Sequence, residues 1–248
     1  MQKAKPFPQE WKLIWNDEFD YTGAPDPKKW GYELGLVRNH EAQTYTKRKE
    51  NVRVENGNLV IEARREAFEG AAYTSASVNT LGKTAFLYGR IEVRAKIPVA
   101  RGQWPAIWMM GENIGVVGWP RCGEIDIMEH VGHEPGIVHA TMHWGASGAK
   151  HQADGGTITI PKVGDDFHVY AVEWHPDRID AFIDGKKYWT FPYTTPDKWA
   201  FDGRCYLLLN LAVGGDWGGQ KGIDDAAFPQ KYLVNYVRVY QSAAYKIP

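Results

Sequence analysis

The chain has 248 residues, of which 44% are hydrophobic, enough to bury a substantial core within one domain. Lys and Arg together number 29 and Asp and Glu 30, which leaves a formal net charge of -1 and no long run of one sign. This balance argues against nucleic acid or an anionic membrane as the partner. No apolar stretch reaches the roughly 18 residues of a membrane span, and the first ten residues lack the apolar core of a secretory leader.

Alternating segments separated by turn residues begin in the first third of the chain. Residues 51–65 predict a β-hairpin, because alternating Val, Leu and Ile flank the tight-turn dipeptide Asn56-Gly57. Residues 89–98 alternate apolar with charged side chains, which predicts a strand with one face in the core and one in solvent.

The second half of the chain continues in the same manner. Its predicted strands lie in residues 167–191, with a hairpin at Asp184-Gly185, and in residues 206–215 and 232–241. No segment keeps an apolar stripe of helical period for three turns. The sequence therefore predicts an all-β protein, an antiparallel β-sandwich that forms a single domain over residues 1–248.

Two composition features leave alternatives open. Cys122 and Cys205 form either one bridge or two free thiols, and the sequence does not choose between them. Aromatic residues are abundant, with 11 Trp, 13 Tyr and 9 Phe. Their flat apolar faces suit core packing, but they also suit the CH-rich faces of sugar rings.

The segment "GEIDIMEH", residues 123–130, places three carboxylates in one predicted strand. In a regular strand Glu124 and Asp126 share a face and Glu129 points to the other. A β-bulge at about Met128 would return Glu129 to the face of the other two acids. The odd spacing therefore predicts either a bulge or a separate role for the third acid.

Three adjacent carboxylates repel one another, which raises the pKa of at least one of them. Two acids with separated pKa values are what glycoside hydrolysis requires, since one attacks or activates water and the other donates a proton. A solvated acidic surface or a cation site are the alternatives. Trp104, Trp108 and Trp119 lie close in sequence to the acids and favour the sugar site.

The string "GEIDIMEHVG", preceded by "GQWPAIWMM" and "YGRIEVRAKIP" and followed by "VHATMHWG", resembles glycoside hydrolase family 16 and within it the laminarinase-type endo-β-1,3-glucanases. The similarity extends from "WNDEFD" to "NYVRVYQ" and so covers nearly the whole chain. It implies a β-jelly roll of two curved antiparallel sheets, a substrate cleft on the concave face and a retaining double-displacement mechanism. The implied substrates are laminarin-like β-1,3-glucans and some mixed β-1,3/1,4-glucans.

The resemblance also implies roles for the acids. Glu124 would be the nucleophile, Glu129 the general acid and base, and Asp126 the acid between them that tunes the nucleophile. Met128 is the extra residue that laminarinase-like members carry and the lichenase branch lacks. The resemblance also implies that catalysis requires no cofactor.

Further residues are implied as substrate contacts. They are Asn39, Glu41 and Tyr45 in "RNHEAQTYT", Arg90 in "YGRIEVRA", Trp104 and Trp108 as platforms, His143 beside the acids, and Trp217 in "GGDWGG". Ordinary loop polarity or core packing is the alternative for each.

A structural calcium ion is implied by the same resemblance. Glu18 and the carbonyl of Gly57 match its ligands, but Asn235 stands where an aspartate is usual. Losing one negative ligand weakens calcium binding, although an amide oxygen still coordinates.

Other readings of the same scaffold are a non-catalytic β-glucan-binding protein and a family 16 enzyme for agar or carrageenan. Retention of all three acids favours the enzyme. Polymeric glucan does not cross a membrane, so we expect a secreted, extracellular monomer whose leader is absent from this chain.

Overall fold

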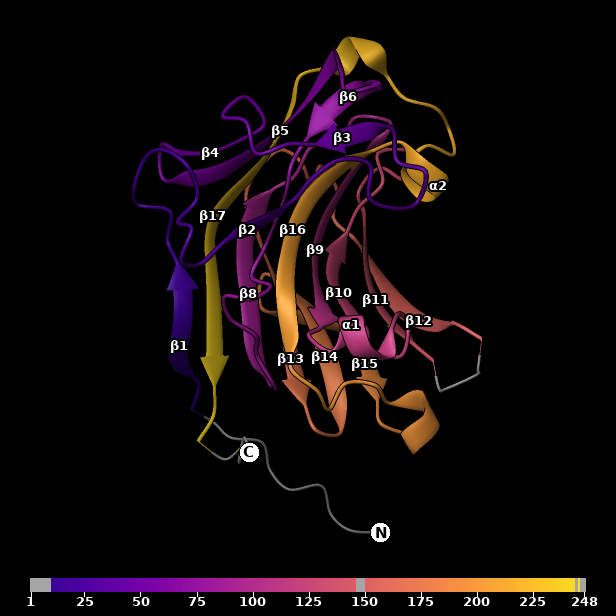
Figure 1. The fold of residues 1–248 in the computed structure, drawn as a ribbon. Coiled ribbons are helices and arrows are strands. Elements are labelled where there is room, and N and C mark those ends of the chain that lie inside the picture. Colours follow the sequence, from indigo (N-terminus) through magenta and orange to yellow (C-terminus); the bar gives the residue numbers. More distant parts are fainter. Residues whose placement is uncertain (1–9, 146–149, 244, 246–248) are drawn as a thin grey trace.

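The computed structural model describes residues 10–145, 150–243 and 245. The first nine residues, on which the expectation about the leader mostly rests, lie outside this part. Within it, the strands form two sheets that pack face to face (Figure 1).

The first sheet has ten strands in the described residues, with the path β15-β14-β13-β8-β17-β5-β6-β3, and with β1 beside β17 and β4 beside β5. Its strands are β1 (Lys12–Asp17), β3 (Gln43–Tyr45), β4 (Val52–Glu55), β5 (Asn58–Phe68), β6 (Ala71–Ser75), β8 (Gly89–Lys96), β13 (His168–His175), β14 (Arg178–Ile183), β15 (Lys186–Pro192) and β17 (Gln230–Gln241). Neighbouring strands are antiparallel, except that β3 pairs with β6 in parallel.

The second sheet has seven strands in the described residues, in the order β12-β11-β10-β9-β16-β7-β2. These are β2 (Gly31–Glu33), β7 (Ser77–Asn79), β9 (Gln103–Gly111), β10 (Glu124–Glu129), β11 (Ile137–Trp144), β12 (Gln152–Thr159) and β16 (Cys205–Val213). Every pairing in this sheet is antiparallel. The acidic segment thus forms a central strand, β10, between β9 and β11.

Helical structure is confined to single turns in the described residues. They are α1 (Ile114–Val117), η1 (Pro196–Lys198), α2 (Gly215–Gly218) and η2 (Asp225–Ala227). No helix among the described residues is long and apolar enough to cross a bilayer. The absence of a helical stripe in the sequence agrees with this structure.

The main hydrophobic core lies between the two sheets. Ile91 and Val93 of β8 enter it from the first sheet, and Ile107 and Ile125 enter it from the second, all four with no exposed surface. Alternation along each strand sends the intervening polar residues to the outer faces. The predicted jelly-roll sandwich of antiparallel sheets is therefore confirmed.

Both predicted hairpins are confirmed. Asn56 and Gly57 have φ values of 53° and 71°, and they join β4 to β5 with Glu55 opposite Asn58. Asp184 and Gly185 take φ values of 50° and 76° between β14 and β15. Positive φ at both central residues is what a two-residue hairpin turn requires, and Gly and Asn or Asp supply it at least cost.

The two cysteines are buried, free thiols. Cys122 lies between α1 and β10, with its Sγ 3.4 Å from Sδ of Met110, and Cys205 begins β16. Of the two alternatives that the sequence left open, the structure has the second.

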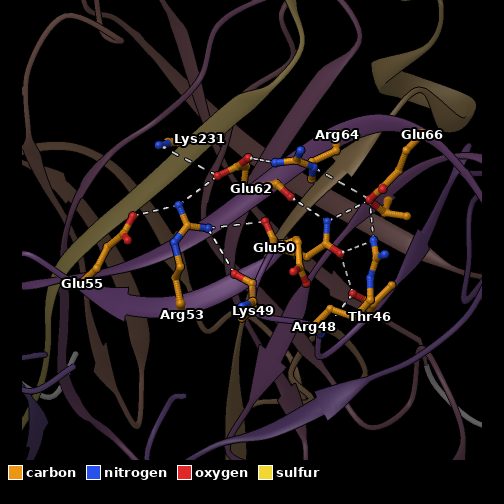
Figure 2. A network of polar contacts seen from close by, with 12 residues as sticks. Thr46, Arg48, Lys49, Glu50, Arg53, Glu55, Glu62, Arg64, Glu66 and Lys231 are labelled. Atoms are coloured by element: carbon orange, nitrogen blue, oxygen red, sulfur yellow. Dashed lines mark hydrogen bonds and ion pairs between the residues drawn. The ribbon is translucent and has the colours of Figure 1, made fainter. Parts of the chain in front are cut away.

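An ionic network fastens the segment after β3 to strand β5 (Figure 2). Glu62 of β5 lies between Arg53, Arg64 and Lys231, and Nη2 of Arg53 donates to its Oε2 over 2.9 Å. The Glu62 side chain is only 5% exposed, so these cations replace the water that its carboxylate loses on burial.

Asn51 ties the backbone of the same region together. It is fully buried, donates to the carbonyl of Glu62 over 3.0 Å and to Thr74 over 2.8 Å, and accepts from Thr46 over 2.6 Å. Strand β3 runs directly into the segment that contains Asn51. The network therefore also holds the end of β3 in place.

We predict that Glu62→Gln lowers the free energy of unfolding by about 1–3 kcal/mol, because it removes charge-assisted hydrogen bonds from Arg53 and Arg64 and the ion pair with Lys231. Urea denaturation measures the change. The matched control is Glu55→Gln, which removes a more exposed partner of Arg53 and should cost less than about 1 kcal/mol. Equal losses in the two variants would contradict the importance of the buried carboxylate.

Candidate active site

Strand β10 carries the predicted bulge. Asp126 pairs with Thr141 of β11 and Glu129 with His139, so three steps along β10 oppose two steps along β11. The register with β9 shifts at the same place, between Asp126 and Met128. One extra residue is therefore present, and the bulge that the acid spacing predicted is confirmed.

Burial shows what the bulge does to the side chains. Ile127 and Met128 are consecutive, yet both belong to the core between the sheets. Glu129 consequently emerges on the opposite face, where it lines one cleft together with Glu124 and Asp126. A regular strand would have sent Glu129 into the apolar core.

The cleft lies on the outer face of the seven-stranded sheet. Its lining residues come from β9, β10, β16 and the loop between β2 and β3, and they are Arg38, Asn39, Glu41, Trp104, Ala106, Trp108, Glu124, Asp126, Glu129 and Asn210. Acids, amides and indoles thus surround one hollow, the combination that suits a sugar with polar hydroxyls and apolar ring faces.

Each glutamate accepts a hydrogen bond from an indole. Nε1 of Trp104 donates to Oε1 of Glu129 over 3.0 Å, and Nε1 of Trp119 donates to Oε2 of Glu124 over 2.6 Å. These bonds hold both carboxylates in fixed rotamers, and each leaves the second oxygen of its carboxylate for another partner.

Asp126 lies between a glutamate and a histidine. It shares a hydrogen bond with Glu124, and its Oδ2 is 3.1 Å from Nε2 of His143, which stands opposite Glu124 on β11. The structure thus brings His143 beside the acids, as the resemblance implied.

The three acids differ in how strongly their ionised forms are disfavoured. Burial raises the pKa of Glu124, while the charge of His143 and the N–H of Trp119 act against that increase. Burial and the charge of Glu124 raise the pKa of Asp126 well above its ordinary value. Burial and the charges of both other acids do the same to the pKa of Glu129. Glu124 is therefore the acid best suited to be ionised, and Glu129 is suited to hold a proton.

The loop between β2 and β3 forms one wall of the cleft. The guanidinium of Arg38 lies 5.0 Å from the ring centre of Trp108 and pairs with Glu33. Nδ2 of Asn39 donates to Oε1 of Glu41 over 3.3 Å. Burial raises the pKa of Glu41, against the hydrogen bond from Gln43.

Tyr45 corrects one prediction. Its side chain is 2% exposed, and its hydroxyl donates to Glu41 over 3.1 Å and accepts from Nδ2 of Asn210 over 2.9 Å. Oδ1 of Asn210 accepts from the indole of Trp108 over 2.7 Å. Tyr45 therefore supports the lining residues from behind and does not line the cleft, because β3 turns it into the interior.

Trp217 extends the aromatic surface beside Trp104. It lies in α2, with its ring 5.5 Å from that of Trp104 and 4.9 Å from that of His139, both edge-on. Gly215 lets α2 pack against the loop that carries Asn39, since a Cβ there would stand 2.9 Å from the carbonyl oxygen of Asn39, and its φ is 77°. Trp217 thus contacts the cleft wall through Trp104.

Arg90 is a second correction. It lies on β8 of the ten-stranded sheet, where it pairs with Glu92 at 2.7 Å and Glu173 at 2.9 Å on the outer face. The acids lie on the outer face of the other sheet, so the hydrophobic core separates Arg90 from them. Alternation places the residue correctly outside the core, but it does not tell which of the two outer faces it reaches.

The residues expected to hold calcium are engaged by the chain itself. Nε and Nη2 of Arg238 donate to the two oxygens of Glu18 over 2.9 and 2.8 Å. Asn235 accepts from Arg94 over 2.9 Å, which turns its amide N–H toward the carbonyl of Gly57, 3.0 Å away. Donors therefore face the oxygens that a cation would need, and the arrangement as it stands does not fit calcium.

Two polar residues that line the cleft, and the contact of Trp119 with Glu124, escaped the sequence interpretation of the site. Arg38 precedes the recognised Asn39 directly, and Asn210 is a lone amide within the apolar run of β16. An amide in a buried strand needs hydrogen-bond partners, and this requirement could have pointed to Asn210 from the sequence. Trp119 was noticed only for its closeness in sequence to the acids, since no periodicity links an exposed loop residue to Glu124.

Comparisons with known proteins agree with this geometry. Residues 39–238 match the family described as glycosyl hydrolases family 16. A beta-glucanase of Rhodothermus marinus is 50% identical, over 93% of this chain and 85% of its own length. The chain belongs to glycoside hydrolase family 16.

Solved structures resemble the whole fold. The X-ray structure of the laminarinase from Rhodothermus marinus has a TM-score of 0.88 and 48% identity, covering 95% of this chain and 99% of that one. The laminarinase catalytic domain from Thermotoga maritima has a TM-score of 0.83 and 41% identity, covering 94% and 99%. SCLam, a non-specific endo-β-1,3(4)-glucanase, has a TM-score of 0.87 and 44% identity, covering 96% and 94%.

We predict that Asp126→Asn stabilises the fold at pH 7 but not at pH 3.5. Folding raises the pKa of Asp126, so the folded state disfavours the ionised form of this side chain. The resulting free-energy penalty is absent below the pKa that Asp126 has in the unfolded chain. It grows as the pH rises toward the pKa that Asp126 has in the folded protein. Asparagine removes the penalty. We therefore expect the stability gained by the substitution to be larger at pH 7 than at pH 3.5.

Urea denaturation of the wild type and the variant at both pH values measures this difference. Asp154→Asn, at an exposed position of β12, is the control and should show no such difference. A gain for Asp126→Asn that is equal at the two pH values would contradict the assigned electrostatic penalty.

We also predict that calcium leaves the melting temperature unchanged. A bound ion at 100 times its Kd would add about 2.7 kcal/mol to the stability of the folded state. For a chain of this size, that would raise Tm by several degrees. Thermal unfolding in EDTA and in millimolar CaCl₂ should coincide, and a rise of several degrees with calcium would show that the Arg238–Glu18 contact yields to the ion.

Proposed function

We propose that this protein is an endo-β-1,3-glucanase that hydrolyses internal bonds of laminarin-like glucans, and some mixed β-1,3/1,4-glucans, with retention of configuration. The main support for the proposal is the bulge in β10, which brings Glu124, Asp126 and Glu129 to one cleft. In this cleft, Glu124 ionises more readily than Glu129. The family and the laminarinase and glucanase names of its relatives support the substrate class.

In the first step, an ionised oxygen of Glu124 attacks the anomeric carbon and the glycosidic bond breaks. Glu129 gives its proton to the departing glycosidic oxygen, so that a neutral hydroxyl leaves. The raised pKa of Glu129 keeps that proton available at neutral pH, and the indole of Trp104 fixes the direction of the carboxyl group.

In the second step, the carboxylate of Glu129 takes a proton from water, whose oxygen attacks the same carbon and releases Glu124. In the structure, Asp126 shares a hydrogen bond with Glu124. This bond stabilises the carboxylate of Glu124, which loses its charge when the ester forms and regains it when the ester is hydrolysed. The charge of Asp126 also raises the pKa of Glu129 and so favours its protonated form.

The walls of the cleft suit a neutral glucan. Trp104 and Trp108 offer aromatic surface for sugar rings, and Asn39, Glu41 and Arg38 offer hydrogen-bonding groups on one side. Because a polymeric glucan cannot enter a cell, we further propose that the protein acts outside it, as a monomer.

The test is digestion of laminarin and lichenan with sizing of the products. We predict that Glu124→Ala lowers the release of reducing sugar by more than about 10⁴-fold while the fold is retained. Azide should then restore turnover of an activated β-glucoside, since it fits the space of the lost carboxylate, and should give the α-glucosyl azide.

Asp166→Ala, at an exposed loop position, serves as the control and should hydrolyse laminarin as the wild type does. Full activity of Glu124→Ala would refute the nucleophile assignment. Binding of laminarin without turnover by the wild type would favour a glucan-binding protein.

A further inference from the structure

One carboxylate oxygen in the acid cluster has no hydrogen-bond partner among the described residues. It is Oδ2 of Asp126, a residue that is 2% exposed. Nε2 of His143 lies 3.1 Å from this oxygen, but the contact does not have the geometry of a hydrogen bond. A buried carboxylate oxygen without a donor is unfavourable, and a bound cation is one of the groups that compensate for it.

The atoms around this oxygen are spaced like the ligands of one metal ion. One oxygen each of Glu124 and Asp126 and one ring nitrogen of His143 all lie within 4.8 Å of one another. A zinc ion binds such atoms at about 2.0–2.2 Å, so two adjacent ligands are about 3 Å apart and two opposite ligands about 4.4 Å. The 3.1 Å between Oδ2 of Asp126 and Nε2 of His143 matches adjacent ligands.

The contacts of the other two side chains are compatible with metal binding. Nε1 of Trp119 donates to Oε2 of Glu124 over 2.6 Å, a bond that fixes the carboxylate without using Oε1. Nδ1 of His143 lies 2.8 Å from Nε2 of His151. When Nδ1 of His143 donates to His151, Nε2 of His143 can offer its lone pair to an ion. Metal-bound histidines usually donate their second ring N–H to an acceptor in this way.

The ligand types select the kind of ion. One imidazole nitrogen with two carboxylates suits Zn²⁺ and related transition metals, whereas Ca²⁺ takes six to eight oxygen ligands. The two carboxylates also balance the two positive charges of such an ion. Glu129 lines the same cleft as Glu124 and Asp126, so the carboxylates there outnumber the guanidinium of Arg38.

We infer that Glu124, Asp126 and His143 form a binding site for a divalent transition-metal ion such as Zn²⁺, and that the bound ion inhibits the enzyme reversibly. The ion displaces the proton in the hydrogen bond between the two acids, and a metal-bound Glu124 cannot attack an anomeric carbon. The side chain of His143 is 21% exposed, which gives the ion a route from solvent. The inhibition rests on the proposed function, whereas the binding does not.

Calorimetric titration with ZnCl₂, on protein without a histidine tag, tests the binding. The wild type should bind one ion per chain with the highest affinity. His143→Phe removes a ligand nitrogen but keeps an aromatic ring, and it should lower this affinity at least about 100-fold. His151→Phe removes only the acceptor behind His143, and it should lower the affinity about tenfold.

His168→Phe is the matched control, because the His168 side chain is 17% exposed and pairs with the carboxylate of Asp184 at 2.7 Å. Its affinity for Zn²⁺ should equal that of the wild type. Should His143→Phe fail to fold, Asp126→Asn with its control Asp154→Asn gives the same comparison. Wild-type affinity in His143→Phe or in Asp126→Asn would overturn the site, and so would the absence of binding by the wild type.

Hydrolysis of laminarin measures the consequence of binding. Added ZnCl₂ should inhibit the wild type with an inhibition constant that agrees with the calorimetric Kd, and EDTA should restore full activity. Saturation with Zn²⁺ that leaves the rate unchanged would overturn the inference. If the wild type fails to hydrolyse laminarin even in EDTA, the proposed function fails, and the calorimetry still decides whether the metal site exists.

Discussion

The bulge in β10 is the constraint on which the cleft depends. Ile127 and Met128 both enter the core, and their burial compensates for the ladder hydrogen bonds that the extra residue interrupts. Since the apolar side chains hold the bulge in place, the position of Glu129 is enforced from the side of the sheet opposite the cleft. The core therefore sets the positions of the three carboxylates. Their mutual repulsion, which raises pKa values, arises on the opposite face of the sheet.

The acids differ in their tendency to ionise because their surroundings differ. Glu124 has an indole donor and lies near His143, whereas Glu129 has an indole donor but faces two other acids. A second layer of hydrogen bonds, from Trp108 through Asn210 and Tyr45 to Glu41, fixes the opposite wall. Such preorganisation lets the site meet a transition state without first rearranging its own dipoles.

Sequence patterns predicted features that depend on local periodicity. The Asn56-Gly57 hairpin and the bulge before Glu129 follow from turn chemistry and from the period of a strand, and both are present. Arg90 and Tyr45 were assigned to the cleft and lie elsewhere, because alternation separates core from surface but does not identify the sheet or layer. The contact of Trp119 with Glu124 could not be predicted, since no periodicity relates an exposed loop residue to the acidic strand.

The state of the two cysteines bears on the surroundings in which the fold persists. Burial raises the pKa of the Cys122 thiol to about 11, and that of Cys205 is also raised, so few thiolates exist at neutral pH to react with oxidants or disulfides. The sandwich is held by packing and ion pairs and requires no covalent cross-link between its cysteines. The folded protein therefore resists oxidation of its thiols, and its stability does not depend on the redox state of its surroundings.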